Sequence, residues 1–381
     1  MATNNNNKAL NVPPLRFPEF NGEWEKCTIK DYGEVVTGNT PPTSNSEYYD
    51  NGSYLWASPA DLGISKNITE TKTKLSLSGF RKTRNIPKGS VLITCIGSTI
   101  GKMGMATETM SSNQQINSIV INDKSDSDFV YYAISRAFPR YLSEVGIQAV
   151  PILSKSNFEK LPNYTTCREE QDKIGYFLNL LDERIATQNK IIEDLKKLKS
   201  AISERLFKGI KGYTVLLSNI CDIVKGKQIN GGNLSKSGNY YVMNGGVEPS
   251  GYYNDYNVEA NTISISEGGN SCGYVQFNTF PFWSGGHCYS IQNVADNVDN
   301  LYLYHYLKSN EDAIMKLRIG SGLPNIQKKD LAIFNIKLPT FEQQKTISTF
   351  LSSLERKTEI EERIQNVMQK QKLYLLQQMF I

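Results

Sequence analysis

Three residues of the sequence match a pattern used by metal-dependent nucleases. Asp61, Glu70 and Lys72 fit the loose D…ExK arrangement, in which carboxylates hold the metal ion. A pattern this permissive also arises by chance in a chain with 21% charged residues. A stand-alone magnesium-dependent nuclease is therefore one alternative function, and magnesium-dependent DNA cleavage by the purified chain would support it.

The other enzyme-like motifs have the wrong spacing or the wrong neighbours. The segment 97–103 resembles a phosphate loop, but it has three residues between its glycines instead of four, and Met103 stands where Ser or Thr would hold magnesium. We expect a tight glycine-rich turn there. Residues 11–15 resemble the Asn-Pro-Pro-aromatic motif of amino methyltransferases, but a Val is inserted and the aromatic residue is missing. His287 beside Cys288 has no evident orienting acid, so the sequence predicts no catalytic residue.

Two clusters of basic and polar residues have a composition that suits DNA. Lysine and arginine contact phosphates, while arginine and asparagine also read base edges. A solvated surface loop is the alternative for any single residue, but clusters occur near the same place in both halves of the chain. The predicted DNA-binding residues are Lys72, Lys74, Arg81, Lys82, Arg84, Lys102, Lys225, Lys227, Asn230, Lys236, Tyr240 and Asn244.

Composition sets the class of protein. A chain of 381 residues with 39% apolar residues can form more than one core, and a net charge of +4 permits nucleic-acid binding without arguing for it. Six cysteines without a CxxC pair, and only two histidines, make a structural zinc site unexpected. The N-terminus lacks a secretory signal and no run reaches 18 apolar residues, so we expect a cytoplasmic protein with no membrane segment.

The element that must position these clusters is a long helix that occurs twice. Residues 169–207 contain one Gly and no Pro, and their apolar positions step by three and four, which predicts a helix roughly 58 Å long. Its pattern returns 173 positions later in residues 342–380. The second seam contains more polar residues, so we expect it to leave surface for partner helices. The predicted subunit-interface residues are Ile174, Leu178, Leu181, Ile185, Leu195, Ile347, Leu351 and Leu354.

The repeat predicts an α+β fold built twice. Two globular α/β domains would be separated by an antiparallel two-helix coiled coil, with the halves related by a pseudo-twofold axis. The alternative is that each helix packs only on its own domain. The expected segments are a flexible tail (1–22), a first domain (23–167), a long helix (168–210), a second domain (211–340) and a C-terminal long helix (341–381).

With these features in place, the chain resembles the specificity subunit of Type I restriction-modification systems. The resemblance is carried by the paired helix openings Glu-x-Gln-x-x-Ile at 169–174 and 342–347, and by the strand-to-glycine segment 87–102. It implies a non-catalytic DNA reader. Each globe would be a target recognition domain that reads one half of a bipartite sequence, and the helix pair would fix the unread gap.

The resemblance also implies partners. Two modification subunits, which bind S-adenosylmethionine and methylate adenine, would dock on the helices. Two restriction subunits, driven by ATP and using Mg, would join them on double-stranded DNA. No cofactor or metal is expected in this chain itself. A coiled-coil scaffold that does not bind nucleic acid remains the other alternative, and it predicts no retention on heparin or duplex DNA.

Overall fold

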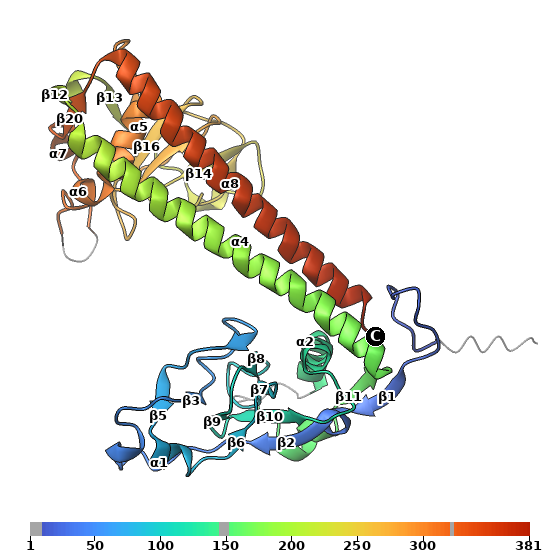
Figure 1. The fold of residues 1–381 in the computed structure, drawn as a ribbon. Coiled ribbons are helices and arrows are strands. Elements are labelled where there is room, and N and C mark those ends of the chain that lie inside the picture. The colour runs from blue at the N-terminus through green and yellow to red at the C-terminus, as the bar shows by residue number, and fades with distance from the viewer. Residues whose placement is uncertain (1–9, 145–151, 321–323) are drawn as a thin grey trace, which may run out of the picture. The chain divides into compact units, whose positions relative to one another are not determined.

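The computed structural model describes residues 10–144, 152–320 and 324–381 (Figure 1). The chain divides into two compact units. The first unit comprises Met1–Thr187 with Gln365–Ile381, and the second comprises Gln188–Ile364. Two long helices, α4 (Arg168–Gly209) and α8 (Phe341–Gln378), each contribute residues to both units.

The first unit contains three small sheets and short helices. The sheet orders are β1-β11, β2-β10-β7-β8-β4 and β5-β3-β9-β6. β7 and β8 are buried along their whole length, as are the first four residues of β10, so they form the centre of the domain. The elements are β1 (Glu25–Thr28), β2 (Gly33–Thr37), β3 (Tyr54–Ala57), β4 (Asn67–Ile68), β5 (Thr73–Leu75), α1 (Leu77–Phe80), β6 (Asn85–Ile86), β7 (Val91–Thr94), β8 (Met103–Ala106), β9 (Met110–Ser112), β10 (Ile116–Ile121), α2 (Ser127–Glu144), α3 (Lys155–Glu159) and β11 (Pro162–Thr165).

The second unit repeats this plan. Its sheet orders are β12-β20, β13-β19-β16-β17 and β15-β14-β18. The elements are β12 (Tyr213–Leu216), β13 (Asp222–Lys225), β14 (Tyr240–Met243), β15 (Tyr252–Tyr253), β16 (Thr262–Ser266), β17 (Val275–Asn278), β18 (Trp283–Ser284), β19 (Cys288–Gln292), α5 (Asn300–Ser309), α6 (Glu311–Met315), α7 (Lys328–Ala332) and β20 (Asn335–Leu338).

The strand pairings show that the two domains are copies of one fold. β2-β10-β7-β8 corresponds to β13-β19-β16-β17, with antiparallel pairing throughout. In the smaller sheets, β3 pairs antiparallel with β5 and parallel with β9, just as β14 pairs with β15 and β18. The predicted duplication of an α/β domain is confirmed.

The two long helices are antiparallel within each unit, and α4 and α8 run side by side in Figure 1. In the second unit, Lys199 Nζ lies 2.7 Å from Glu355 Oε1, and Gln188 Nε2 donates to Glu361 Oε2 at 2.6 Å. In the first unit, Lys372 forms an ion pair with Asp182. Lys372 and Asp182 are the repeat equivalents of Lys199 and Glu355, so the helices pair in the same register in both units.

Polar interruptions of the second seam are therefore used inside the helix pair. Glu361 accepts from Gln188 and Lys372 pairs with Asp182, while Thr358 is buried and donates to the Leu354 carbonyl of its own helix. The expectation that such positions remain open for partner helices does not hold for these three residues.

Each helix also packs on its own domain through a polar contact beside the ion pair. Tyr132 of α2 donates to Asp182 at 2.6 Å, and Tyr304 of α5 donates to Glu355 at 3.0 Å. Burial first, and then the charge of the carboxylate, raise the pKa of both phenols well above the usual range. Each phenol therefore stays protonated and remains a hydrogen-bond donor.

The glutamine of the repeated helix opening has a structural role in both units. Gln171 Oε1 accepts from the Asp126 amide at 3.0 Å, and its repeat equivalent Gln344 accepts from the Asp299 amide at 2.9 Å. Both side chains are buried, and their Nε2 atoms donate to backbone oxygens just before the helix. The motif thus joins the helix start to the loop that opens α2 or α5.

A glycine permits the close approach of α4 to the start of α2. A Cβ added to Gly175 would lie 2.3 Å from Asp126 Oδ1 and 2.9 Å from the Phe129 nitrogen. The equivalent residue of α8 is Ser348, which is buried and also small. In each unit, the small residue at this position of the long helix therefore allows the helix to pack closely on its domain.

Residues 10–22, expected to be part of a flexible tail, make specific contacts in the first unit. Arg16 Nε lies 2.7 Å from Glu170 Oε1, and the Leu15 amide donates to the Gln378 carbonyl at 2.8 Å. The Phe17 ring packs edge-on against Phe177 at a centroid distance of 5.9 Å. This segment therefore covers the start of α4 and the end of α8.

The burial of His305 predicts an acid-sensitive second unit. His305 Nε2 lies 2.9 Å from Ser352 Oγ, and burial lowers the pKa of the imidazole to about 4. In the unfolded chain the histidine has a pKa near 6.5, so between about pH 6.5 and 4 it binds a proton that the buried imidazole of the folded unit does not bind. The free energy of unfolding therefore falls as the pH drops through this range. The expected loss is roughly 3 kcal/mol at most. His305→Gln should reduce this slope in urea unfolding followed by circular dichroism, and an identical slope in both chains would contradict the assignment.

Candidate nucleic-acid interface

Predicted DNA-binding residues of the first unit gather around the β5-β3-β9-β6 sheet. Lys74 lies on β5, Lys72 precedes it, Arg81 follows α1, and Lys82 and Arg84 lead into β6. Lys72, Arg81, Lys82 and Arg84 are exposed. Lys74 is half-buried and pairs with Glu70, its Nζ lying 2.9 Å from the carboxylate. Cations therefore lie on or beside both edge strands of this sheet, β5 and β6.

Asn39, which the sequence did not single out, holds the loop that carries two of these cations. Its Nδ2 donates to the Lys82 carbonyl at 2.9 Å, and its Oδ1 accepts from the Arg84 amide at 2.8 Å. Arg84 Nη1 in turn donates to the Thr37 carbonyl at 2.9 Å. Lys82 is left projecting from a fixed loop. No charge or spacing signal marks Asn39 in the sequence, because its partners are backbone atoms.

Lys102 lies apart from this sheet. It precedes β8 in the other sheet, and its side chain is in contact range of Gly63, where an added Cβ would lie 3.2 Å from Lys102 Cγ. The segment 97–103 forms the expected tight connection between β7 and β8. The Ile100 amide donates to Gly97 and the Gly101 amide to Thr94, so these amides are not free to bind a phosphate.

The nuclease-like residues serve local structure. Asp61 is buried, and its carboxylate accepts from the Ser58 amide at 2.9 Å and from the Lys72 amide at 2.8 Å. Glu70 instead points to Lys74. Within the described ranges, no group of three His, Cys, Asp or Glu side chains could hold a metal ion. Asp61 therefore stabilises a loop rather than joining Glu70 in a metal site.

In the second unit, a buried carboxylate lies beside predicted DNA-binding residues. Lys225 Nζ is 2.7 Å from Glu267 Oε1, Tyr289 donates to the same oxygen at 3.1 Å, and His287 Nδ1 lies 3.9 Å from Glu267 Oε2. Burial, and then the Glu267 charge, raise the pKa of the Tyr289 phenol well above its usual range. Asn244 accepts from the His287 amide at 3.1 Å.

This cluster contains two residues that sequence reasoning missed in this role. Glu267 directly follows a buried strand, and His287 follows Gly285 and Gly286. A polar residue at the end of a strand or within a glycine-rich turn is the feature of the sequence that could have identified them. The Lys225 charge is partly neutralised by Glu267, which lowers its value as a phosphate contact.

The remaining predicted residues of the second unit are held by other local contacts. The Lys227 carbonyl accepts from Trp283 Nε1 at 2.9 Å, and Asn230 accepts from the Gly232 amide at 3.0 Å. Tyr240 on β14 packs against Tyr256 with centroids 4.8 Å apart, and Lys236 is exposed in the loop before it. The Lys227 amide also donates to the Ser284 carbonyl at 2.8 Å, so Lys227 and Asn244 both contact the turn of residues 283–287.

Several of the predicted subunit-interface residues lie in the cores of their own units. Ile174, Leu178 and Leu351 are almost fully buried, because the face of each helix that carries the apolar repeat packs on its own domain. These three cannot contact a partner subunit in the folded unit. Leu181, Ile185, Leu195, Ile347 and Leu354 are half-buried. Other apolar helix residues are exposed, namely Tyr176, Leu180, Ile191, Leu198, Phe341, Phe350, Ile360, Ile364, Val367, Leu373 and Tyr374.

None of the helices that the structure describes combines the length and the apolar character of a membrane span.

The sequence matches the family described as the Type I restriction modification DNA specificity domain, over residues 21–197 and again over 213–370. Among curated relatives, the HindI specificity subunit of Haemophilus influenzae is 29% identical over 46% of this chain and 39% of its own length. The MjaIX specificity subunit of Methanocaldococcus jannaschii is 32% identical over 49% of this chain and 44% of its own length. The aligned part of the chain thus spans less than half of each.

Longer similarities are weaker in identity. The MjaVIII specificity subunit of Methanocaldococcus jannaschii is 24% identical over 94% of this chain and 91% of its own length. The crystal structure of a Type I restriction-modification S subunit from M. genitalium has a TM-score of 0.70 at 19% identity, covering 97% of this chain and 99% of that one. A chain from a structure of a type I R-M system, reported for its complex assembly and conformational transition, has a TM-score of 0.59 at 16% identity over 93% of this chain and 95% of that one. These two structures establish a shared fold.

Asn39 should control the order of the cationic loop. Asn39→Ala removes the hydrogen bonds to Lys82 and Arg84, and we expect a loss of about 1–3 kcal/mol in unfolding free energy. Amide exchange at Arg84 should become faster. Asn45→Ala is the matched control, because the Asn45 side chain accepts from the nearby Glu47 amide instead of from the loop that carries Lys82 and Arg84. Unchanged exchange at Arg84 in the Asn39 variant would show that other contacts fix the loop.

Proposed function

This chain belongs to the Type I restriction modification DNA specificity family, and we propose that it recognises a bipartite DNA sequence, with each domain reading one half. The observation that carries the proposal is the duplication of one domain, with exposed cationic and polar loops in each copy. Two similar readers with different loop side chains suit two different half-sites. Base readout in a groove needs few side chains, whereas phosphate contacts need cations such as Arg81 and Lys82.

We propose a role without catalysis in this chain. Its recognition surfaces would act by binding, and the chemistry on DNA would belong to other subunits. S-adenosylmethionine, ATP and Mg would accordingly be bound by two modification subunits and two restriction subunits. The exposed apolar residues on α4 and α8, such as Ile191, Ile360 and Val367, are better candidates for docking these partners than the buried seam.

The two alternatives fare less well against the geometry. The nuclease alternative requires Asp61 and Glu70 to share a metal, but Asp61 is occupied by backbone donors and Glu70 by Lys74. The scaffold alternative gives no reason for the fixed cationic loop next to Asn39.

The cationic loop predicts salt-dependent DNA binding. Replacing Arg81, Lys82 and Arg84 with Ala should weaken binding of duplex DNA by the purified chain. Each lost phosphate contact should flatten the plot of log affinity against log salt by about 0.9, so the slope should change by up to roughly three. Fluorescence anisotropy at several salt concentrations measures this slope.

A matched control separates local contacts from overall charge. Lys190, Arg363 and Lys370 are exposed on the long helices, and replacing them with Ala removes the same charge. We expect a smaller change in slope for this control. Equal slopes for both triple variants would place the DNA surface of the first domain elsewhere.

The helix pair is proposed to set the number of base pairs between the two half-sites. Inserting four residues at facing positions of α4 and α8 adds about 6 Å, close to the rise of two base pairs at roughly 3.4 Å each. Methylation sequencing of cells that carry the variant with its modification partner should show a gap longer by about two base pairs. Continued methylation with an unchanged gap would refute the role of the helices as a ruler.

A control for this insertion changes α4 alone. It should shift α4 by about one turn against α8, separating Gln188 from Glu361 and Lys199 from Glu355. We expect loss of methylation rather than a new gap.

A further inference from the structure

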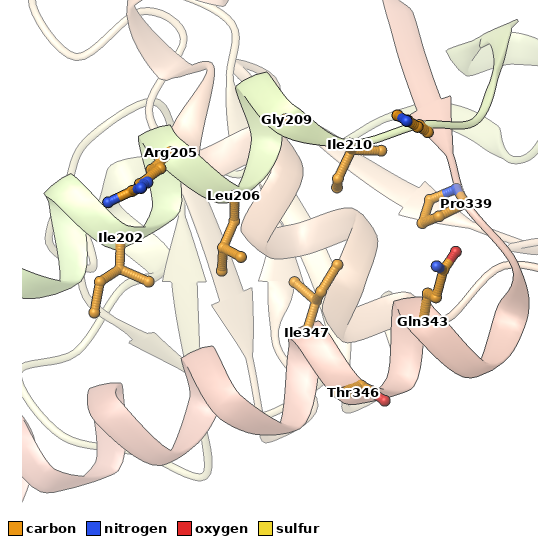
Figure 2. Close-up of a pocket in the computed structure, with 10 residues that line it drawn as sticks. Ile202, Arg205, Leu206, Gly209, Ile210, Pro339, Gln343, Thr346 and Ile347 are labelled. Atoms are coloured by element: carbon orange, nitrogen blue, oxygen red, sulfur yellow. The ribbon is translucent and has the colours of Figure 1, made fainter.

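A pocket of about 650 Å³ lies in the second unit between the end of α4 and the start of α8. Its apolar lining comes from Ile202, Leu206, Ile210, Pro339 and Ile347. Figure 2 shows Leu206 of α4 pointing toward α8 and Ile347 of α8 pointing toward α4. The space between these side chains is open to solvent.

The first unit has a corresponding groove, and there it is filled. Residues 10–22 lie along the start of α4 and the end of α8, with Arg16 paired to Glu170, Phe17 under the Lys173 ammonium at 4.6 Å, and the Leu15 amide bonded to the Gln378 carbonyl. The segment turns at residues 18–19, and its two aromatic rings, Phe17 and Phe20, both lie near the Lys173 ammonium. It shows what kind of ligand this groove accepts.

The internal repeat relates residues of the filled groove to residues that line the open pocket. Adding 173 to Glu170 and Lys173 gives Gln343 and Thr346, and subtracting 173 from Gln378 gives Arg205. All three counterparts line the pocket. The pocket is therefore the second copy of a groove that binds a chain segment.

Among the residues of the second unit that the structure describes, no such segment fills the second groove. α4 ends at Gly209 and β12 begins at Tyr213, so no long stretch of chain precedes β12 as residues 10–24 precede β1. The consequence is exposed apolar surface. Ile347 is half-buried while its counterpart Ile174 is 2% exposed, and Phe350 is 46% exposed.

We propose that this pocket binds a segment of another protein chain, in which a large aromatic side chain is flanked by a carboxylate. The aromatic ring would cover Ile347 and Phe350, as Phe17 covers the equivalent surface. The carboxylate would face Arg205 and Lys211, which line the pocket and have no ion-pair partner among the residues described. The proposal does not depend on DNA recognition.

Charge argues against a second copy of this chain as the occupant. The segment 10–22 carries Arg16, which needs the Glu170 carboxylate, but the pocket offers the neutral Gln343 and the cation Arg205. An arginine in that place would lack its partner and meet a like charge. The groove has kept its apolar surface while its charge preference has reversed.

Two labelled peptides test the proposal on the full-length chain. One has the natural sequence of residues 10–24, and the other carries Arg16→Glu. In anisotropy titrations we expect the Arg16→Glu peptide to bind about three- to tenfold more tightly. Arg205→Glu in the protein should reverse this order. Thr346→Trp should fill the pocket and abolish binding of both peptides, while Thr349→Trp, also on α8 but outside the pocket lining, should not.

Several results would overturn the proposal. If neither peptide binds, the pocket is not a docking site. The same conclusion follows if Arg205→Glu leaves the preference between the two peptides unchanged. That second result is also expected if the peptides displace residues 10–22 from the first-unit groove. Tighter binding of the natural peptide, together with concentration-dependent dimerisation in light scattering, would identify a second copy as the occupant instead. Circular dichroism of each variant verifies that the chain remains folded.

Discussion

The contact on which each unit depends is a carboxylate shared by three elements. Asp182 and Glu355 sit at equivalent positions of α4 and α8, and each accepts a phenol from its own domain while it pairs with a lysine of the opposite helix. All four charged side chains are at least two-thirds buried, so the attraction is less screened than at the surface. Hydrogen bonds to charged groups contribute about 1.5–3 kcal/mol each, and losing the carboxylate would leave both a phenol and an ammonium without a partner. Domain position and helix register are thereby fixed by the same group.

The contacts that join each domain to the long helices are common to the two units, whereas the recognition loops differ. The buried glutamines at the helix openings, the shared carboxylates and the strand orders recur. Beside them, Asn39 organises the loop of the first domain through two backbone bonds, while the second domain uses a buried Glu267 with Lys225 and Tyr289. The two copies therefore share the contacts between each domain and its long helix, and they differ in the side chains of the recognition loops.

Sequence alone predicted the duplicated α/β domain, the long helices and their antiparallel pairing, because apolar spacing and a constant offset of 173 are properties of the chain itself. It could not tell which apolar face meets the chain's own domain, and Ile174, Leu178 and Leu351 were assigned to partners although they are buried in the cores. The basic clusters were visible as composition. Whether a cation is free depends on neighbours distant in the chain, as with Lys225 and Glu267, and Asn39 acts through backbone atoms that no motif records. The groove beside Arg205 likewise becomes visible only when both copies are compared.

The close contact at Gly175 has a consequence for how such a chain can evolve. Because a single added carbon would collide with Asp126 and Phe129, the loop that opens α2 and the first turns of α4 must change together. A recombination event that imported a foreign domain but kept the resident helix start would risk a steric clash at this point. Crossovers that carry the domain together with the first turns of the following helix avoid this clash. The segment that is inherited as a unit therefore includes the start of α4 as well as the globular domain.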